Sequence, residues 1–417
     1  MREVTHRLLM DDRQSQSIRR LMAAWLTWLA LGMGMSLSAA RAAQPALAGP
    51  GDLGRDGRCG LGKGIFVTLA GNRMGVPDEV KDSPYAAGVQ AGLTWAQLEP
   101  KKGQYNWDEV ESFLAELDKC GKKGAFKFVS VAGKVMSESQ LARGKGRAGP
   151  EVAFVNSGTP QWLWDDPNVK RLGGIATPKG RLPYYPVYWD PAYQRHLEEF
   201  IEAFARRYDG DKRIEYIRMG GWQVGTNEPS FYGGASEFIV DQLAAHGMDT
   251  GSLGDERKIS RALTDKSLYA VAVRDMIDIW YKHFTKTRLA ATIHFSKDEG
   301  SFEEAMMKHC FDRKTTILNT GLNEKDKSEA RTEYRAAHDR YGCKVGWGGI
   351  THIGQFLDEQ ELSAKGRTVK FEAIVQGIGD DDNPQYAPAS KVSYLVFGID
   401  FLTDQKAVKW ASEHLVQ

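Results

Sequence analysis

The sequence predicts an α/β fold, a (β/α)8 TIM barrel formed by a single domain over residues 64–417. From residue 64 onward, strand-like apolar segments alternate with helix-like segments, an order that favours a parallel sheet covered by helices. The strand-like segments number nine, close to the eight that such a barrel needs. A chain of 417 residues with 42% hydrophobic residues is also long enough to bury one large core.

The strand candidates are short runs of apolar and β-branched residues bounded by turn residues. They are 65–70, 87–95, 125–131, 214–222, 289–295, 316–320, 344–350, 369–375 and a short one at 399–402. Because an eightfold barrel has room for only eight of these nine, we expect either 316–320 or 344–350 to be irregular or to lie outside the barrel.

The helix candidates lie between these strands, and the clearest is 191–208. Its apolar residues recur at helical spacing, at Leu197, Phe200 and Phe204, and Asp190 is a plausible N-cap before Pro191 at the first helical position. The full set is 107–120, 191–208, 265–285, 302–311, 324–341, 387–397 and 405–416. Long connections at 132–190 and 229–264 follow strands, so in a barrel they would shape a binding cleft.

The N-terminal region predicts export from the cytoplasm. Residues 22–40 are apolar and uncharged, follow Arg19-Arg20, and end in small residues before Ala42. This pattern is typical of a secretory signal peptide, residues 1–42, followed by a lead-in segment at 43–63. The alternative is an uncleaved membrane anchor. With cleavage, we expect a periplasmic or secreted protein without stable membrane insertion.

Composition argues against several classes of function. The chain has 55 basic and 54 acidic residues, so its net charge of +1 gives no electrostatic case for binding nucleic acid. No His, Cys and carboxylate set has the spacing of a metal site, so we expect no metal and no cofactor. The four cysteines, Cys59, Cys120, Cys310 and Cys343, are expected to be structural, and their pairing stays open. Eleven Trp and fifteen Tyr residues offer aromatic faces to sugar rings, although large barrels also bury many aromatics.

The most informative motif is Asn227-Glu228-Pro229, which follows the apolar segment 214–221. If that segment is a strand, Glu228 lies at its C-terminal end, and Pro229 stops further pairing. A carboxyl group at the end of a barrel strand, beside an amide that can bind a sugar hydroxyl, suits the chemistry of the glycosidic bond. The alternative is a solvated turn.

A second motif extends from Gly92 to Asp108 and includes Trp95, Glu99-Pro100 and Tyr105. It matches W-x-x-(I/L)-E-P-x-x-G-x-Y-x-(F/W)-D, and Pro160-Gln161-Trp162-Leu163 and the 190–208 segment follow in the expected order. With these motifs the chain resembles clan A glycoside hydrolases, including family 42 β-galactosidases. The resemblance is good from about residue 88 to residue 229 and weaker afterwards. It implies that Glu99 is structural and that Trp95 either lines the cleft or packs the top of the barrel.

The resemblance also implies a retaining mechanism on a β-linked oligo- or polysaccharide. Glu228 would protonate the leaving oxygen and later activate water, while a nucleophile at the end of the seventh strand would attack the anomeric carbon. The best candidate for the nucleophile is Glu372, in the predicted strand 369–375. Its rivals are Asp400 and the three aspartates at 380–382.

Further polar and aromatic residues near the predicted strand ends are candidates for substrate contact. They are Asn227, for the 2-hydroxyl group, with Trp95, Trp162, Trp222, Tyr232, His294 and Trp347. Two alternatives to a retaining hydrolase remain. One is a catalytically silent barrel that binds polysaccharide during exopolysaccharide assembly or export. The other is an inverting glycosidase that pairs Glu228 with an aspartate of 380–382.

Overall fold

The computed structural model describes the barrel strands and most of the helices around them. The described residues are 64–69, 74–130, 158–173, 176–177, 180–181, 184–222, 242–247, 266–293, 301–313, 315–319, 345–350, 368–382 and 392–415, with single positions at 332, 335, 336, 384, 387 and 389. All of them belong to the compact unit Asp56–Gln417. The predicted signal peptide and lead-in segment lie outside the described residues.

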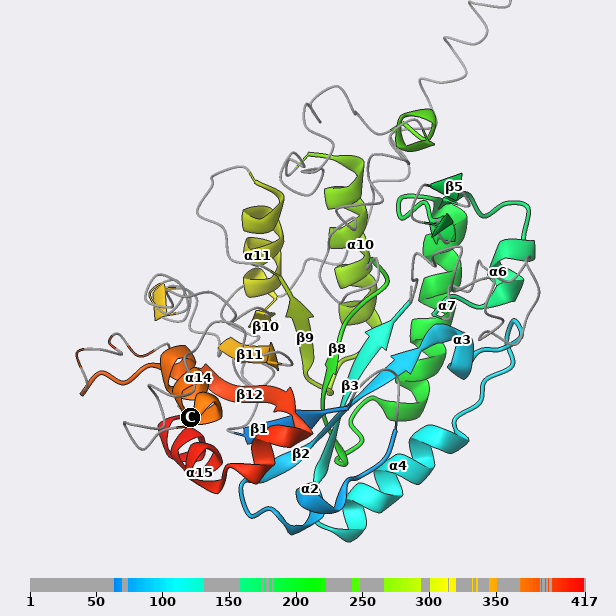
Figure 1. The fold of residues 1–417 in the computed structure, drawn as a ribbon. Coiled ribbons are helices and arrows are strands. Elements are labelled where there is room, and N and C mark those ends of the chain that lie inside the picture. Colours follow the sequence, from blue (N-terminus) through cyan, green and yellow to red (C-terminus); the bar gives the residue numbers. More distant parts are fainter. Residues whose placement is uncertain are drawn as a thin grey trace, which may run out of the picture. The chain divides into compact units, whose positions relative to one another are not determined.

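Eight parallel strands form a closed barrel (Figure 1). In chain order they are β1 (Gly64–Thr68), β2 (Ala86–Thr94), β3 (Lys123–Val129), β8 (Ile214–Arg218), β9 (Leu289–Thr292), β10 (Thr316–Asn319), β11 (Val345–Ile350) and β12 (Val392–Gly398). Each strand pairs with the next, and β12 pairs back onto β1, which closes the ring. The prediction of a parallel barrel is therefore confirmed. Of the two alternatives for 316–320 and 344–350, a place outside the barrel is wrong, because both segments are barrel strands. The other alternative, irregularity, applies to 344–350, because the register of β11 against β12 shifts at two points.

Two predicted strands are helices, and one predicted helix is a strand. The segment predicted as strand 369–375 is helix α14 (Val369–Ile378), and 399–402 belongs to the short 3-10 helix η3 (Ile399–Thr403). The eighth strand β12 lies mostly within the predicted helix 387–397. Six of the ten residues of helix α14 are buried, so its short sequence is mostly apolar and has no clear helical period to distinguish it from a strand.

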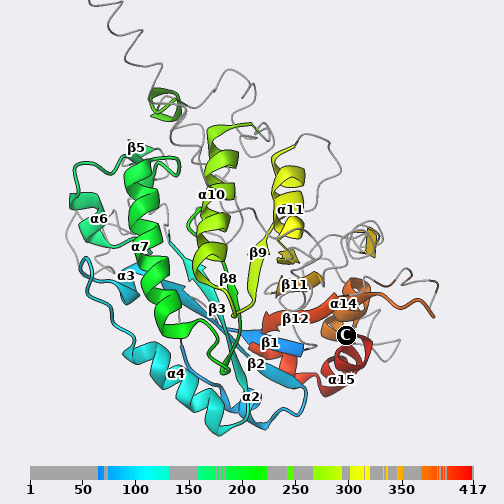
Figure 2. The same cartoon turned by 180° about the vertical axis from the view of Figure 1, so that it is seen from behind.

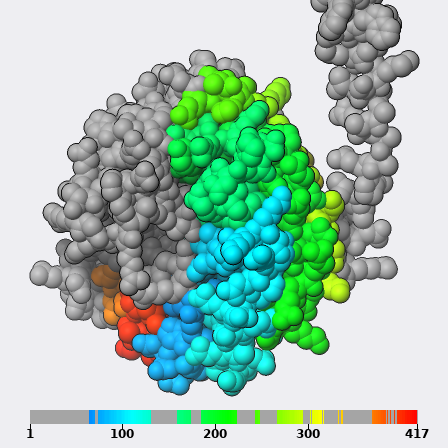
Figure 3. Space-filling view, turned by 90° about the vertical axis from the view of Figure 1, so that its right-hand side faces the viewer, coloured from blue at the N-terminus to red at the C-terminus, as the bar shows by residue number. Residues whose placement is uncertain are grey.

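Helices cover the outside of the barrel (Figure 2). They are α2 (Asp78–Asp82), α3 (Trp95–Leu98), α4 (Asp108–Lys119), α6 (Gln161–Asp165), α7 (Pro191–Tyr208), α10 (Leu268–His283), α11 (Phe302–Asp312), α14 and α15 (Gln405–His414). Five of the seven predicted helices match α4, α7, α10, α11 and α15 to within a few residues. On the face shown in Figure 3, the α4, α6 and α7 regions, coloured cyan to green, lie side by side. Most of the predicted helix 324–341 lies outside the described residues.

The β3–α7 connection includes two small antiparallel pairs. Strand β4 (Arg171–Gly173) pairs with β7 (Tyr184–Pro186), and β5 (Ala176–Thr177) pairs with β6 (Gly180–Arg181). Asp190 occupies the N-cap position of α7 as predicted, but its side chain does not cap the helix. Its Oδ2 instead accepts a hydrogen bond from the Lys170 backbone N–H at 2.9 Å, which ties the end of this connection to the start of α7.

The outward-facing residues of β3 show how strands and helices pack. The ring of Phe126 contacts Phe113 of α4, and the ring of Phe128 lies against Phe200 of α7 and Trp280 of α10. These rings are fully or almost fully buried and belong to the main core between barrel and helices. Because side chains alternate along a strand, the residues between them face the barrel axis.

A separate apolar layer fills the inside of the barrel. It consists of Phe66, Ala125, Tyr216, Ala290 and Val396, each from a different strand. The rings of Phe66 and Tyr216 meet edge to face with centroids 5.5 Å apart, and the Tyr216 hydroxyl lies 3.0 Å from Gln90 Oε1, to which it donates. The inside of the barrel is therefore filled with side chains at this level, as is common in parallel barrels.

Two of the four cysteines lie within the described residues. Cys120 and Cys310 are free thiols there, and burial raises the pKa of Cys310 to about 12. Cys59 and Cys343 lie outside the described residues, so the question of their pairing stays open. Within the part of the chain that is described, no helix has the length and apolar character to cross a membrane.

Candidate functional site

The candidate site is the barrel mouth, the end of the barrel at which the parallel strands end. Ligand sites of such barrels lie at this end because long loops follow each strand there. On four of the strands, the inward-facing residue two positions after the apolar-layer residue is polar. These four residues are Thr68, Lys127, Arg218 and Thr292. The floor of the mouth is therefore a polar layer resting on an apolar one.

The inward direction of the two charged residues follows from their neighbours. Lys127 lies between Phe126 and Phe128, which both face the covering helices. Arg218 lies between Ile217 and Met219, and both of these belong to the outer core. Strand alternation therefore turns Lys127 and Arg218 toward the barrel axis.

These two cations are register partners on neighbouring strands β3 and β8. Arg218 is only 4% exposed, and its Nε donates a hydrogen bond to the hydroxyl of Thr292 on the next strand. Burial, together with the nearby positive charge of Arg218, lowers the pKa of Lys127 to about 8. Among the described residues, the floor of the mouth thus has two neighbouring cationic side chains at neutral pH.

The Asn227-Glu228-Pro229 motif follows the fourth barrel strand, β8. The described chain continues from Arg218 to Trp222, and the backbone N–H of Met219 donates to the carbonyl of Ala290 at 2.8 Å. Asn227 and Glu228 lie outside the described residues, as do Tyr232 and His294. Their roles in the site stay predictions.

Glu99 has the structural role that the resemblance implies. It is 3% exposed, and its carboxylate accepts hydrogen bonds from the indole of Trp95 and the backbone N–H of Gly103, both at 2.7 Å. Burial raises the pKa of Glu99, while these two hydrogen bonds act in the opposite direction. The residue therefore fixes the turn after α3, with its oxygens directed into the protein.

Two of the tryptophans expected at the substrate are fully buried. Trp95 is 0% exposed and packs against Trp162, Tyr193 and Phe200, so of the two roles considered for it the structure favours packing at the top of the barrel. Trp222 is also 0% exposed, and its indole N–H has no hydrogen-bond partner among the described residues. Neither has ring surface to offer a sugar in this structure.

The other two tryptophans expected at the substrate are Trp162 and Trp347. Trp162 is partly exposed, and its indole donates to the backbone carbonyl of Glu99 at 3.0 Å. The ammonium of Lys102 lies 5.9 Å from the centre of the Trp162 ring, on the outside of the barrel top. Trp347 lies in β11, of which the backbone alone is described. Contact of either residue with substrate stays a prediction.

Glu372 does not lie at the end of a strand. The seventh barrel strand is β11, whose sequence, Val-Gly-Trp-Gly-Gly-Ile, has no acidic residue. Glu372 instead lies in the first turn of α14, 3% exposed, where its Oε1 accepts a hydrogen bond from Gln376 at 3.1 Å. The expectation of a nucleophile at the end of strand 369–375 is therefore corrected: the segment is a helix outside the barrel sheet.

The aspartates at 380–382 lie at the end of the barrel opposite the mouth. They follow α14 and precede β12, and such a helix-to-strand connection lies where the strands begin. Asp381 pairs there with Arg335 at 2.6 Å. Asp400, by contrast, follows β12 in η3, where it is exposed and lies 3.6 Å from the ammonium of Lys370.

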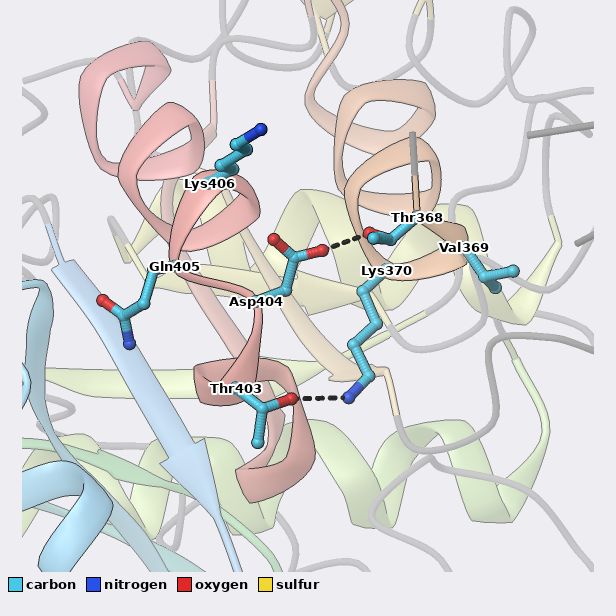
Figure 4. A pocket seen from close by; sticks show the side chains of 7 residues that line it. All are labelled: Thr368, Val369, Lys370, Thr403, Asp404, Gln405 and Lys406. Carbon is cyan, nitrogen blue, oxygen red and sulfur yellow. Dashed lines mark hydrogen bonds between the residues drawn. The ribbon is translucent and has the colours of Figure 1, made fainter. Parts of the chain in front are cut away.

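A cavity of about 420 Å³ lies between the starts of α14 and α15 (Figure 4). Its lining residues are Thr368, Val369, Lys370, Thr403, Asp404, Gln405 and Lys406. The Thr368 hydroxyl donates to Asp404, whose carboxylate also accepts from the first turn of α15, and Lys370 donates to Thr403 at 3.0 Å. These polar groups hold the starts of α14 and α15 together, so the cavity is a junction between the two helices.

The chain is similar to solved structures of sugar-cleaving enzymes. They include the catalytic domain of β-amylase from Paenibacillus polymyxa (12% identity, 83% of this chain and 95% of that one, TM-score 0.49). They also include β-galactosidase from the psychrophilic Marinomonas ef1 (12%, 80% and 53%, 0.42) and xylanase B from Clostridium stercorarium F9 (11%, 81% and 86%, 0.40). No protein-family model and no curated sequence matches the chain.

The three structures are glycoside hydrolases, the class of enzyme that the sequence resembles. At 11–12% identity and TM-scores below 0.5, this likeness carries no argument about activity. The barrel itself is established by the pairing of its own eight strands.

Proposed function

We propose that the chain is a glycosidase that hydrolyses a β-linked oligo- or polysaccharide in the barrel mouth, with Glu228 as general acid and base. The observation that carries the proposal is the position of β8 as the fourth strand of a closed parallel barrel, with the Asn-Glu-Pro motif in the segment that follows it. A protonated Glu228 gives its proton to the leaving oxygen and then takes one from water. Asn227 binds the 2-hydroxyl group of the sugar.

The reaction needs a second carboxylate. The retaining course implied by the resemblance requires a second carboxyl group about 5 Å from that of Glu228. Glu372 was expected to supply it from the seventh strand, but it lies on α14. The Glu372→Gln variant decides its role: a nucleophile loses turnover while the fold is kept, and azide restores turnover in Glu372→Ala. A residue that serves only α14 leaves turnover unchanged.

The test of the proposal is hydrolysis of a panel of β-linked oligosaccharides and aryl β-glycosides by the purified protein. We expect Glu228→Gln to lower kcat on the oligosaccharides by about 100-fold or more, because general acid catalysis is lost. Glu202→Gln, on the outer face of α7, is the control and retains full turnover. Hydrolysis that survives in Glu228→Gln would overturn the assignment.

A second candidate function is a catalytically silent barrel that binds polysaccharide in exopolysaccharide assembly or export. The weaker resemblance after residue 229 and the position of Glu372 on α14 support this candidate, because the retaining course needs a partner carboxylate for Glu228. Saturable binding of a polysaccharide without turnover, unchanged by Glu228→Gln, would support this candidate over the hydrolase.

We also propose that the protein is exported and works in the periplasm or outside the cell. The apolar segment 22–40 and the small residues before Ala42 support this proposal. Mass spectrometry of the protein recovered from the periplasmic fraction should give an N-terminus near residue 43. Recovery of the intact chain in the membrane fraction would instead indicate an uncleaved anchor.

A further inference from the structure

Beyond β8, three consecutive backbone carbonyls accept hydrogen bonds from aromatic side chains. The N–H of Met219 still donates to the carbonyl of Ala290 in β9, but Gly220, Gly221 and Trp222 belong to no strand. A buried carbonyl that has left a sheet needs another donor, because leaving it unpaired is unfavourable. The side chains that supply these donors therefore help to fix the path of the chain after β8.

The three donors come from α7 and α10, two covering helices that lie side by side (Figure 2). The indole N–H of Trp280 donates to the first of the three carbonyls at 2.8 Å. The hydroxyl of Tyr193 donates to the second, and the hydroxyl of Tyr269 donates to the third at 2.7 Å. All three side chains are fully buried, and burial raises the pKa of both phenols, so both keep the proton that they donate.

The middle residue of this segment also fits closely between the two helices. Gly221 has a φ of 124°, a conformation that favours glycine. A Cβ at this position would lie 2.6 Å from the side chain of Leu197 on α7 and 3.2 Å from the sulfur of Met276 on α10. Residues 220–222 therefore have little room to move toward either helix, and a movement away from the helices lengthens the hydrogen bonds.

We propose that Tyr193, Tyr269 and Trp280 are positioning residues for the general acid and base of the proposed glycosidase. By holding residues 220–222, they set the point from which the chain leads to Glu228, six residues beyond this segment. The inference rests on the proposed function, because the three side chains are buried and act only through Glu228. A general acid must lie within hydrogen-bond reach of the atom that it protonates, so a displacement of about 1 Å can lower the rate about 100-fold.

The first test is hydrogen exchange followed by mass spectrometry, which needs no substrate. We expect the backbone amides of residues 220–228 to exchange about fivefold or more faster in Tyr193→Phe and in Tyr269→Phe, because the segment loses one of these three hydrogen bonds. Tyr281→Phe is the matched control, because it removes a hydroxyl near the other end of α10, where that hydroxyl lies 2.6 Å from the hydroxyl of Thr315. Its amides at 220–228 should exchange like those of the unmodified protein.

The second test compares turnover on the substrate that the panel of β-linked sugars identifies. Tyr269→Phe should lower kcat about tenfold and leave KM within about twofold, while Tyr281→Phe retains full turnover. In a Glu228→Gln background, Tyr269→Phe should cause no further loss, whereas a general loss of stability would lower turnover in both backgrounds. The kcat/KM for a dinitrophenyl glycoside, whose leaving group needs no proton, should be unchanged by Tyr269→Phe.

The outcomes separate this inference from the proposed function. Unchanged exchange in both variants, or exchange in the unmodified protein as fast as in an unfolded chain, overturns the inference and leaves the glycosidase intact. A loss of turnover that persists in the Glu228→Gln background also overturns it, because the residues then act on the fold in general. Hydrolysis that survives in Glu228→Gln, or no hydrolysis at all, overturns both proposals. Tyr193→Phe and Tyr269→Phe test the same segment from different helices, so either one suffices if the other does not fold.

Discussion

The buried ammonium of Lys127 should make the stability of this barrel depend on pH in a defined way. Its pKa falls from the ordinary 10.5 to about 8 in the folded chain, because burial and then the charge of Arg218 disfavour the protonated form. That difference corresponds to about 3 kcal/mol of destabilisation when the lysine is protonated. The unfolded chain binds more protons between about pH 8 and 10.5, so stability rises with pH across that window.

The Lys127→Met variant removes this charge and nearly keeps the side-chain volume. We expect it to be more stable than the unmodified protein at pH 7, and the gap should shrink by about 2 kcal/mol between pH 7 and 9.5. Urea unfolding at a series of pH values measures the gap. Lys123→Met, on the exposed start of the same strand, should follow the unmodified protein throughout. A gap for Lys127→Met that stays constant with pH would refute the reasoning.

Three further predictions concern the frame of the barrel. Glu99→Gln should lower the free energy of unfolding in urea by about 1–3 kcal/mol, because one of the two buried N–H groups that donate to Glu99 would then face the N–H of the glutamine amide. An unchanged free energy of unfolding would contradict the structural role of Glu99. The pKa of Asp209 is lowered because hydrogen bonds from residues 285–287 outweigh its burial, so Asp209→Asn should cost about 2 kcal/mol at pH 7. This cost should vanish as acid protonates the native carboxylate, and a cost unchanged at pH 2 would contradict the argument. Gly88→Ala should fail to give soluble protein, because the added Cβ would lie 1.9 Å from the Lys123 carbonyl oxygen. Gly75→Ala is the control: a Cβ at that position meets open space, so this variant should melt at the same temperature as the unmodified protein.

The sequence predicted the first half of the barrel well because its elements have clear local signals. The helix 191–208 has a regular apolar stripe and Pro191 at its start, and the structure has the same bounds. The prediction of a strand at 369–375 was wrong because a short apolar run fits a buried strand and a buried helix equally. The available signal was Thr368, whose side chain accepts a hydrogen bond from Phe371 and begins α14.

The same ambiguity carried over to the candidate site. Glu372 is a candidate nucleophile only if 369–375 is a strand, so the wrong secondary structure for this segment also gave Glu372 the wrong position in the barrel. Lys127 and Arg218 were missed because each is one charged residue within an apolar strand, and the charge in the mouth emerges only when β3 and β8 pair. The alternation of Phe126, Lys127 and Phe128 could have indicated an inward lysine once the strand was assigned to a barrel.

Closure of the barrel by β1 and β12 has a consequence for how the chain folds. These strands are the first and last of the ring, and Gly64 pairs with Tyr394, so their contact spans most of the chain. During synthesis the sheet keeps two unpaired edges until residue 398 has left the ribosome, and an open edge invites pairing with other chains. Any truncation that removes β12 should therefore yield an aggregating sheet, because the ring has no earlier point at which it can close.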